Sequence, residues 1–318
     1  MARVLAALGG NALSRPGGTG DWAEAILQMR ATAPTLVEIL RDGHELILTH
    51  GNGPQVGQLL RQNELSAREV PARPMHVLGA ETQGQIGYLI AQELTPALQR
   101  ARIARTVLPW VCRVAVSARD PAFRNPSKPV GRLYDEAESR ILRKREGWIM
   151  HYDGGRGGWR RVVPSPLPVK WVEAEAFRTW IDQGLLGKVV PIVTGGGGIP
   201  VVERAGGMYE GIDAVIDKDL TAAMVAAETR SDTLAIVTDV PAVAVGYKKP
   251  WERWLSEVTL SEIEPLLARG EFGEGSMRPK VQAGLNFLRS GGRRVIITDI
   301  PSLSRALHDE AGTRIIAG

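Results

Sequence analysis

The sequence contains only one cysteine, Cys112, so no disulfide bond can form within the chain. So little cysteine is typical of proteins from reducing compartments. Long apolar runs are also missing, because no stretch approaches the roughly 18–20 residues that a helix needs to cross a bilayer. The apolar stretch at the amino terminus stops at Gly9, which is too early for a signal peptide. We therefore expect a cytoplasmic protein that does not contact a membrane.

Several signatures of common enzyme classes are absent. The phosphate-binding pattern Gly-x-x-x-x-Gly-Lys-Ser/Thr does not occur, and neither do the loop motifs of protein kinases. Segment 51–57 has its last glycine one residue too late for a dinucleotide-binding motif. The five histidines are not spaced as metal-binding pairs, and no Gly-x-Ser-x-Gly nucleophile motif is present. These absences argue against P-loop enzymes, NAD-dependent enzymes, histidine-based metal sites and serine hydrolases.

Neither sign of charge is in strong excess overall. The chain has 39 lysines and arginines and 35 acidic residues, which gives a net charge of +4. Positive charge is concentrated between residues 100 and 161, where fifteen basic and six acidic residues give +9. A solvated basic surface and a site for an anion explain this segment equally well. No recognised nucleic-acid-binding module accompanies the charge, so we expect no nucleic-acid partner.

Lysine is scarce, because only eight of the 39 basic residues are lysines. A compositional preference of the genome for arginine explains most of this bias. Three lysines nevertheless lie in compact, turn-like contexts: Lys128 and Lys280 lie beside prolines, and Lys218 lies between two aspartates. A compact ammonium group suits contact with a phosphate as a point charge, which a planar guanidinium group does not provide. The three lysines are therefore candidates for an anion site.

Short apolar runs alternate with helical periodicity over most of the chain. This alternation, with strands that are apolar on both faces, predicts an α/β fold whose parallel sheet is covered by helices on both sides. The expected strands are residues 4–8, 46–48, 107–116, 189–193, 233–238, 295–298 and 313–317. The expected helices are residues 22–41, 55–65, 75–98, 174–183, 218–229, 261–269, 280–290 and 302–309.

The alternation breaks between residues 117 and 168, where proline and glycine are frequent. Such punctuation predicts turns and short ribbons in place of a strand–helix–strand unit. An insertion of this kind is more often a lid or a partner surface than a separately folding domain.

Glycines follow three of the predicted strands, in the clusters 9–10, 51–53 and 195–198. In open α/β sheets, ligands bind beyond the carboxyl ends of the strands, where backbone N–H groups favour anions. Tight turns without a ligand would explain any one cluster. Three clusters at three strand ends favour an anion site.

Two helix starts carry lysines in unusual places. Asp217 and Asp219 flank Lys218 at the start of a predicted helix, where acidic residues are common as simple caps. In a functional interpretation, the lysine neutralises a transferring phosphoryl group and a carboxylate orients the lysine or a metal-bound water. Lys280 lies in the first turn of another helix, where the helix dipole disfavours a cation unless an anion is near. Trp251 and Trp254 suggest packing or surface positions and receive no role.

Nine segments resemble the carbamate kinase family, a branch of the amino acid kinase superfamily. They follow the order of that family and cover essentially the whole chain: residues 8–13, 49–57, 79–87, 120–131, 160–166, 195–201, 214–220, 238–240 and 275–280. Segments 120–131 and 160–166 are the most specific. They resemble the protruding subdomain that separates carbamate kinases from other amino acid kinases.

The resemblance implies one amino-acid-kinase-like domain over residues 1–318. This domain would be an open three-layer αβα sandwich around a mainly parallel sheet of about eight strands. Residues 117–168 would form a protruding lid, 1–190 mainly the carbamate side and 191–318 mainly the nucleotide side. The family also implies a homodimer. Its reaction is reversible phosphoryl transfer between ATP and carbamate, giving ADP and carbamoyl phosphate, with Mg²⁺ carried by the nucleotide. The expected use is formation of ATP during arginine breakdown.

The resemblance also implies roles for individual residues. Those that would hold carbamate and the transferring phosphoryl group are Gly10, Asn11, Gly51, Asn52 and Gly53. The implied catalytic residues are Lys128 from the lid, Lys218 and Lys280 beside the phosphates, and Asp217, which would orient the lysines. The residues that would border the nucleotide are Gly9, Gly196, Asp239, Met277 and Lys280.

Two positions depart from the family pattern. Arg278 replaces a glycine between Met277 and Pro279, and Pro241 stands where an acidic residue is usual. Both changes bear on nucleotide affinity and not on the fold. Two other functions stay open, a kinase of the same fold for another small acid and a non-catalytic nucleotide sensor. The insertion at 117–168 argues against the first, and the presence of all three lysines argues against the second.

Overall fold

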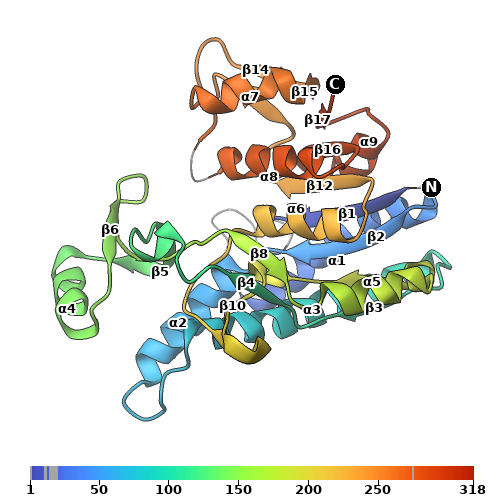
Figure 1. Ribbon diagram of the computed structural model, residues 1–318. Helices are drawn as coiled ribbons and strands as arrows, with labels where there is room; N and C mark the ends of the chain where they lie inside the picture. Colours follow the sequence, from blue (N-terminus) through green and yellow to red (C-terminus); the bar gives the residue numbers. More distant parts are fainter. Residues whose placement is uncertain (1, 11–12, 14–20, 274–275) are drawn as a thin grey trace.

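The computed structural model describes residues 2–10, 13, 21–273 and 276–318. Its centre is an eight-stranded sheet in the order β15-β17-β16-β12-β1-β2-β9-β3 (Figure 1). Strands β16, β12, β1, β2, β9 and β3 are parallel, whereas β17 pairs with β16 in antiparallel fashion. The predicted α/β fold with a mainly parallel sheet of about eight strands is therefore confirmed. The bounds are β1 (Arg3–Leu8), β2 (Glu45–His50), β3 (Thr106–Pro109), β9 (Val189–Ile192), β12 (Thr233–Thr238), β15 (Glu257–Thr259), β16 (Arg294–Asp299) and β17 (Thr313–Ile316).

Helices cover both faces of this sheet. One face packs against α1 (Trp22–Arg41), α3 (Met75–Arg100) and α9 (Leu303–Leu307). The other packs against α5 (Ala174–Asp182), α6 (Lys218–Glu228), α7 (Leu260–Ala268) and α8 (Met277–Arg289). Successive side chains of a strand point to opposite faces, so Val4, Ala6 and Leu8 enter the first layer while Leu5 and Ala7 enter the second. This is why the middle residues of β1, β2, β12 and β16 are apolar.

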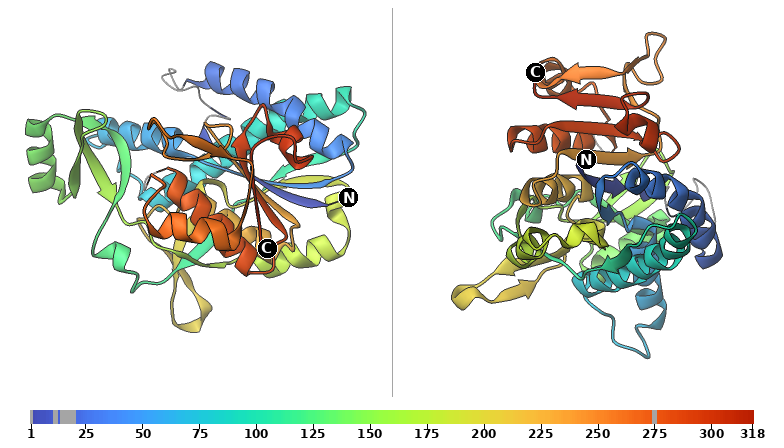
Figure 2. Two further views of the ribbon diagram at one scale, coloured as in Figure 1. Left: turned by 90° about the horizontal axis from the view of Figure 1, so that it is seen from above. Right: turned by 90° about the vertical axis from the view of Figure 1, so that its right-hand side faces the viewer.

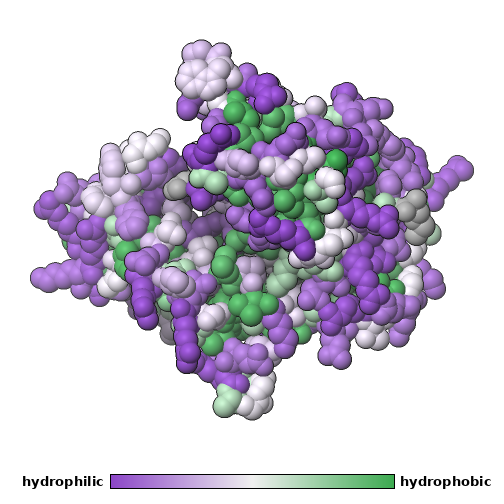
Figure 3. Space-filling view, turned by 45° about the horizontal axis from the view of Figure 1, so that its top comes forward, coloured by the Kyte–Doolittle hydropathy of each residue, from purple (hydrophilic) through white to green (hydrophobic). Residues whose placement is uncertain are grey.

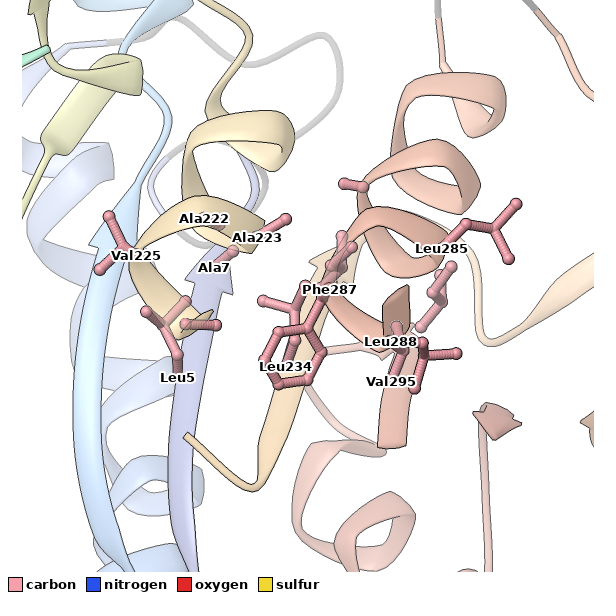
Figure 4. Packing of buried hydrophobic residues seen from close by; sticks show 14 of the residues in the cluster. Leu5, Ala7, Ala222, Ala223, Val225, Leu234, Leu285, Phe287, Leu288 and Val295 are labelled. Carbon is pink, nitrogen blue, oxygen red and sulfur yellow. The ribbon is translucent and has the colours of Figure 1, made fainter. Parts of the chain in front are cut away.

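Figure 4 shows the second layer from close by, with Leu5 and Ala7 of β1 facing Ala222 and Val225 of α6. Phe287 of α8 is almost completely buried in the same cluster. Burial of a large apolar side chain contributes about 1.5–3 kcal/mol relative to exposure. The core therefore fixes α6 and α8 on one face of the sheet, with the first turn of each helix at the same end.

A second, four-stranded sheet has the order β11-β10-β4-β8, with β4 (Arg113–Val116), β8 (Pro168–Trp171), β10 (Ile199–Glu203) and β11 (Tyr209–Gly211). The prediction of one strand over residues 107–116 is wrong, because β3 and β4 belong to different sheets. Between them, the amide of Cys112 donates to Oε1 of Gln83 (2.8 Å), and Nε2 of Gln83 donates to the Cys112 carbonyl (3.1 Å). The Gln83 side chain thus pairs with the backbone N–H and carbonyl groups of Cys112, at the point where the chain passes from one sheet to the other.

Residues 117–167 leave the body between β4 and β8, and we call them the projecting segment (green, at the left of Figure 1). They contain the three-stranded antiparallel sheet β5-β7-β6 and one helix, α4. The bounds are β5 (Lys128–Tyr134), α4 (Glu136–Glu146), β6 (Met150–Asp153) and β7 (Gly158–Val163). Figure 2 shows the same segment standing away from the main sheet, and its surface at the left of Figure 3 is mainly hydrophilic.

Helix α4 was not predicted, because only turns and ribbons were expected in this stretch. Its only fully buried residue is Ser139, so it has no apolar stripe to reveal it. A capping box joins Asp135 and Glu138 at its start, and Gly147 ends it in a left-handed conformation with φ of 66°. Local capping therefore defines this helix where apolar periodicity does not.

The remaining elements are α2 (Gly53–Ser66), which extends from the body toward the projecting segment, and the hairpin of β13 (Val243–Val245) with β14 (Arg253–Leu255). In the part of the chain that the structure describes, no helix is long and apolar enough to span a membrane.

The loop after β9 joins the two sheets. Thr194, Gly196, Gly197 and Gly198 all have φ between 48° and 92°. A Cβ atom on Gly197 would collide with the carbonyl oxygen of Ile216, directly before α6. Positive φ together with this close approach requires glycine at position 197.

We predict that Gly197→Ala destabilises the protein more than Gly270→Ala. Both glycines have positive φ, 92° and 73°, but a Cβ on Gly270 meets no atom within 4 Å. The Gly270 variant should lose about 1 kcal/mol for its left-handed backbone alone. The Gly197 variant should lose at least twice as much, as measured by urea unfolding. Equal losses would mean that the contact with Ile216 is unimportant.

Candidate active site

A cleft of about 690 Å³ lies at the carboxyl ends of the central strands. The loop after β2, the starts of α6 and α8, and the projecting segment all contribute to its walls. The predicted site residues that line it are Gly51, Asn52, Gly53, Lys128, Gly196, Asp217, Lys218 and Lys280. The structure thus brings together residues from five separate parts of the sequence.

The glycine loops form one side of the cleft. The Gly51 amide donates to the Leu8 carbonyl (3.0 Å), which ties the loop after β2 to the end of β1. A Cβ on Gly51 would lie 3.5 Å from Cδ of Lys218, and one on Gly9 would lie 2.6 Å from the Val237 carbonyl oxygen. Gly9 and Gly10 are adjacent to the cleft but are not among its lining residues. Asn11 lies outside the described residues.

Asn52 is held by its neighbours and does not cap α2 with its side chain. Its amide nitrogen donates to the Thr82 hydroxyl (2.8 Å), which in turn donates to the Gly79 carbonyl (2.7 Å). A Cβ on Gly196 would overlap the Asn52 side chain. Thr82 was not predicted as a site residue, although it lies within the motif at 79–87.

Asp219 is the centre of the charged part of the site. Its Oδ1 lies 2.5 Å from Nζ of Lys218, and its Oδ2 lies 2.9 Å from Nζ of Lys280. The residue is only 3% exposed. One buried carboxylate therefore pairs with two lysines, and the resulting group has a net positive charge.

Burial by itself would raise the pKa of Asp219, but the positive charges of Lys218 and Lys280 hold it at about 2. Burial lowers the pKa of Lys218 despite its contact with Asp219. For Lys280, burial is outweighed by Asp219, so its pKa is raised. The carboxylate therefore stays ionised at neutral pH and stabilises the charged form of Lys280.

Asp217 holds the third lysine. Its Oδ2 lies 2.9 Å from Nζ of Lys128, which comes from the first residue of β5. Its Oδ1 accepts the Asp219 amide (2.9 Å), so the same carboxylate caps α6. We predicted that Asp217 would orient the lysines; among the described residues it forms an ion pair with Lys128 alone, while its charge also raises the pKa of Lys218 and Lys280. The residue that contacts Lys218 and Lys280 is Asp219, which the sequence analysis noticed but did not assign.

A smaller cavity of about 150 Å³ adjoins the cleft at Ser276, which lines both. Asp239 and Met277, predicted to border the nucleotide, line this cavity. Its other walls are largely apolar and include the aromatic residues Tyr247, Trp254 and Phe272. Tyr247 and Trp254 come from the β13–β14 region and contact each other edge to face, with ring centroids 6.2 Å apart.

Trp254 therefore lies in a cavity wall, although the sequence analysis gave it no role. Its neighbour Trp251 is more exposed, at 64%, and does not line the cavity. Trp251 lies in the turn before β14, whereas Trp254 is the middle residue of this strand. The hairpin that contains β14 was not predicted.

The two departures from the family pattern lie outside both cavities. Arg278 is exposed in the first turn of α8 and is not among the described residues that line either cavity. The Pro241 carbonyl accepts the Thr298 hydroxyl (3.1 Å), while the adjacent Val240 and Ala242 line the smaller cavity. The neighbours of Arg278, which are Met277 and Pro279, line the smaller cavity and the cleft, so the effect of Arg278 on nucleotide affinity stays a prediction.

The described residues contain no group of three or more histidine, cysteine, aspartate or glutamate side chains that could hold a metal ion. The carboxylates in the cleft, Asp217 and Asp219, are both occupied by lysines. The donor set thus suits an anion and does not suit a metal bound by the protein alone. His50, next to the Gly51 loop, is buried, and burial lowers its pKa to about 4.

Comparison with known proteins agrees with this geometry. A family model described as "Amino acid kinase family" matches residues 2–299. The chain is 44% identical to a carbamate kinase of Pyrococcus horikoshii over 315 residues, which is 98% of each chain. It is also 44% identical to a carbamate kinase of Trichomonas vaginalis over 99% of each chain.

A solved structure of carbamate kinase from Giardia lamblia bound to AMP-PNP superimposes with a TM-score of 0.90 and 41% identity. The match covers 100% of this chain and 99% of that one. A structure from Aeropyrum pernix gives a TM-score of 0.92 and 39% identity over 99% of this chain and 100% of that one. The chain therefore belongs to the amino acid kinase family and, within it, to the carbamate kinases.

Proposed function

We propose that this protein transfers a phosphoryl group reversibly between ATP and carbamate, giving ADP and carbamoyl phosphate. The observation that carries the proposal is the group formed by Asp219, Lys218 and Lys280, which faces the Gly51 loop across the cleft. Phosphoryl transfer needs in-line positioning and neutralisation of charge more than covalent chemistry. Two paired ammonium groups beside a glycine loop supply both.

The proposed division of the site follows its two cavities. The triphosphate would lie along Lys218 and Lys280, with the adenine in the smaller cavity between Trp254 and Met277. Carbamate would lie near Gly51, Asn52 and Gly53, where backbone N–H groups and an amide can bind it. Gly10 and Asn11 belong to this proposed carbamate subsite. Gly9 and Gly196 belong to the proposed nucleotide subsite.

Lys128 would act from the projecting segment. Its side chain is 37% exposed and its contact with Asp217 is the ion pair that joins this segment to the start of α6. In the proposed reaction, Lys128 leaves Asp217 for an oxygen of the transferring phosphoryl group. Residues 117–168 would thus act as a lid. Residues 1–190 would mainly bind carbamate, and 191–318 would mainly bind the nucleotide.

Mg²⁺ enters the proposal as part of the substrate, because the nucleotide would bind as its magnesium complex. The ion neutralises phosphate charge during transfer. The homodimer, the cytoplasmic location and formation of ATP during arginine breakdown remain predictions from the family.

The direct test is formation of ATP from ADP and carbamoyl phosphate, measured with a coupled assay. Lys280→Ala should lower kcat by about 10²–10³-fold, the loss typical for removal of a group that stabilises developing charge. Lys188→Ala, which removes an exposed lysine far from the cleft, should keep the wild-type rate. No turnover by the wild type, with ADP still bound, would favour another phosphate acceptor or a nucleotide sensor.

The smaller cavity makes a separate prediction about the nucleotide. Trp254→Ala should raise the KM for ADP about tenfold with little change in kcat, because stacking of a base on an aromatic ring contributes about 1–3 kcal/mol. Trp251→Ala is the matched control, since this tryptophan lies nearby but outside the cavity wall, and its KM should stay within twofold. Equal effects of the two substitutions would mean that adenine binds elsewhere.

A further inference from the structure

A third cavity, of about 420 Å³, lies between the projecting segment and α2. Its walls come from α2 and the chain after it, and from β5, α4, Trp148 and Arg161 of the projecting segment. Arg61 and Arg132 line this cavity and also the cleft, so the two spaces share a wall. The proposed phosphoryl transfer does not use this cavity.

The shared wall is a network of polar contacts between the body and the projecting segment. The Tyr134 hydroxyl donates to Glu64 of α2 (2.6 Å), and Arg61 pairs with the same glutamate (3.1 Å). Arg132 lies over the Tyr134 ring, with its Cζ 4.1 Å from the centroid, and pairs with Glu138 (2.6 Å). The charged groups named here therefore pair with one another within the wall.

Arginines dominate the lining, and almost all of them have carboxylate partners. Besides the pairs of Arg61 and Arg132, Arg73 pairs with Glu81 (2.8 Å) and Arg145 with Glu146 (2.6 Å). The three lining glutamates, at positions 64, 138 and 146, are therefore all engaged.

Arg161 is the exception. Among the described residues, no carboxylate lies within ion-pair distance of its guanidinium group, which lies over Trp148 with Cζ 4.5 Å from the ring centroid. An aromatic face attracts the charge but accepts no hydrogen bond in the plane of the guanidinium group. Arg161 is partly buried, and burial lowers its pKa. Asp213, Glu64 and Glu146 raise this pKa by their charge, but none of them lies within ion-pair distance, so the guanidinium donors stay available to an anion.

A second unused donor lies in the same lining. The Nε atom of Arg132 is buried and has no hydrogen-bond partner among the described residues. Arg132 and Arg161 are on β5 and β7, which pair with each other. The rest of the lining includes the apolar side chains of Leu60, Ile141, Leu142 and Trp148. The cavity therefore combines Arg161, whose guanidinium group has no carboxylate partner among the described residues, with an apolar wall.

We propose that this cavity is a binding site for a small organic carboxylate. The carboxylate group would accept hydrogen bonds from Arg161, and the apolar body would lie against Trp148 and Ile141. Arginine binds carboxylates through two parallel hydrogen bonds, which a compact carboxylate can form in a cavity of this size. The site is separate from the proposed reaction and does not depend on it.

Benzoate is a suitable probe, with binding measured by titration calorimetry on the full chain. Saturating AMP-PNP with Mg²⁺ should be present so that benzoate does not enter the cleft, whose wall also contains Arg61 and Arg132. The wild type should bind one equivalent. Arg161→Gln should weaken binding at least tenfold. Arg140→Gln should leave binding unchanged, because Arg140 is exposed on α4, pairs with Glu136 and does not line the cavity.

Ile141→Glu provides a second test that does not rely on a buried position. Ile141 is 59% exposed, so the substitution should not disturb folding, and its negative charge should repel the probe. We expect binding to weaken at least fivefold. If Arg161→Gln fails to fold, as judged by circular dichroism, the affinity of Ile141→Glu for benzoate decides whether the proposal holds. The proposal would be overturned by absence of saturable benzoate binding to the wild type, or by wild-type affinity in both variants.

Discussion

The carboxylate of Asp219 is the interaction on which the proposed site depends. It lies between the ammonium groups of Lys218 and Lys280 and is almost completely buried. Two lysines so close together would repel each other, and burial would favour their neutral forms. One shared carboxylate offsets the repulsion and, for Lys280, also the effect of burial, whereas the pKa of Lys218 stays lowered. The positions of the two lysines are therefore set before an anionic substrate enters.

The fold explains how three distant segments reach this carboxylate. Helices α6 and α8 pack side by side on one face of the sheet, so their first turns meet at the carboxyl ends of the central strands. The glycine loop after β2 closes against Lys218, and Asp217 caps α6 while it pairs with Lys128. The projecting segment is thus connected to the same helix start that carries the central group. In the sequence, these three positions could be noticed because lysine is scarce and each of them lies in a compact, turn-like context.

Much of the fold and part of the site could be predicted from the sequence. Strands β1 and β12 could be predicted from their apolar runs, because a strand that is buried on both faces has apolar residues at successive positions. Lys128, Lys218 and Lys280 could be selected because their contexts are unusual in an arginine-rich chain. Asp219 could not be separated from Asp217, since both are acidic residues at a helix start and only the packing of α8 distinguishes them. Helix α4 was missed because it has no apolar period and is defined by local capping, and the wall at Trp254 was missed because its other residues come from distant segments.

The most direct test of this account is the activity of Asp219→Asn. An asparagine keeps the shape of the side chain but removes the charge that both lysines share. The account predicts that kcat for ATP formation falls at least 100-fold in protein that remains folded, while Asp213→Asn, at an exposed aspartate paired with His76, keeps full activity. A kcat of Asp219→Asn within threefold of the wild type would contradict the account, because the lysines would then not need their common carboxylate.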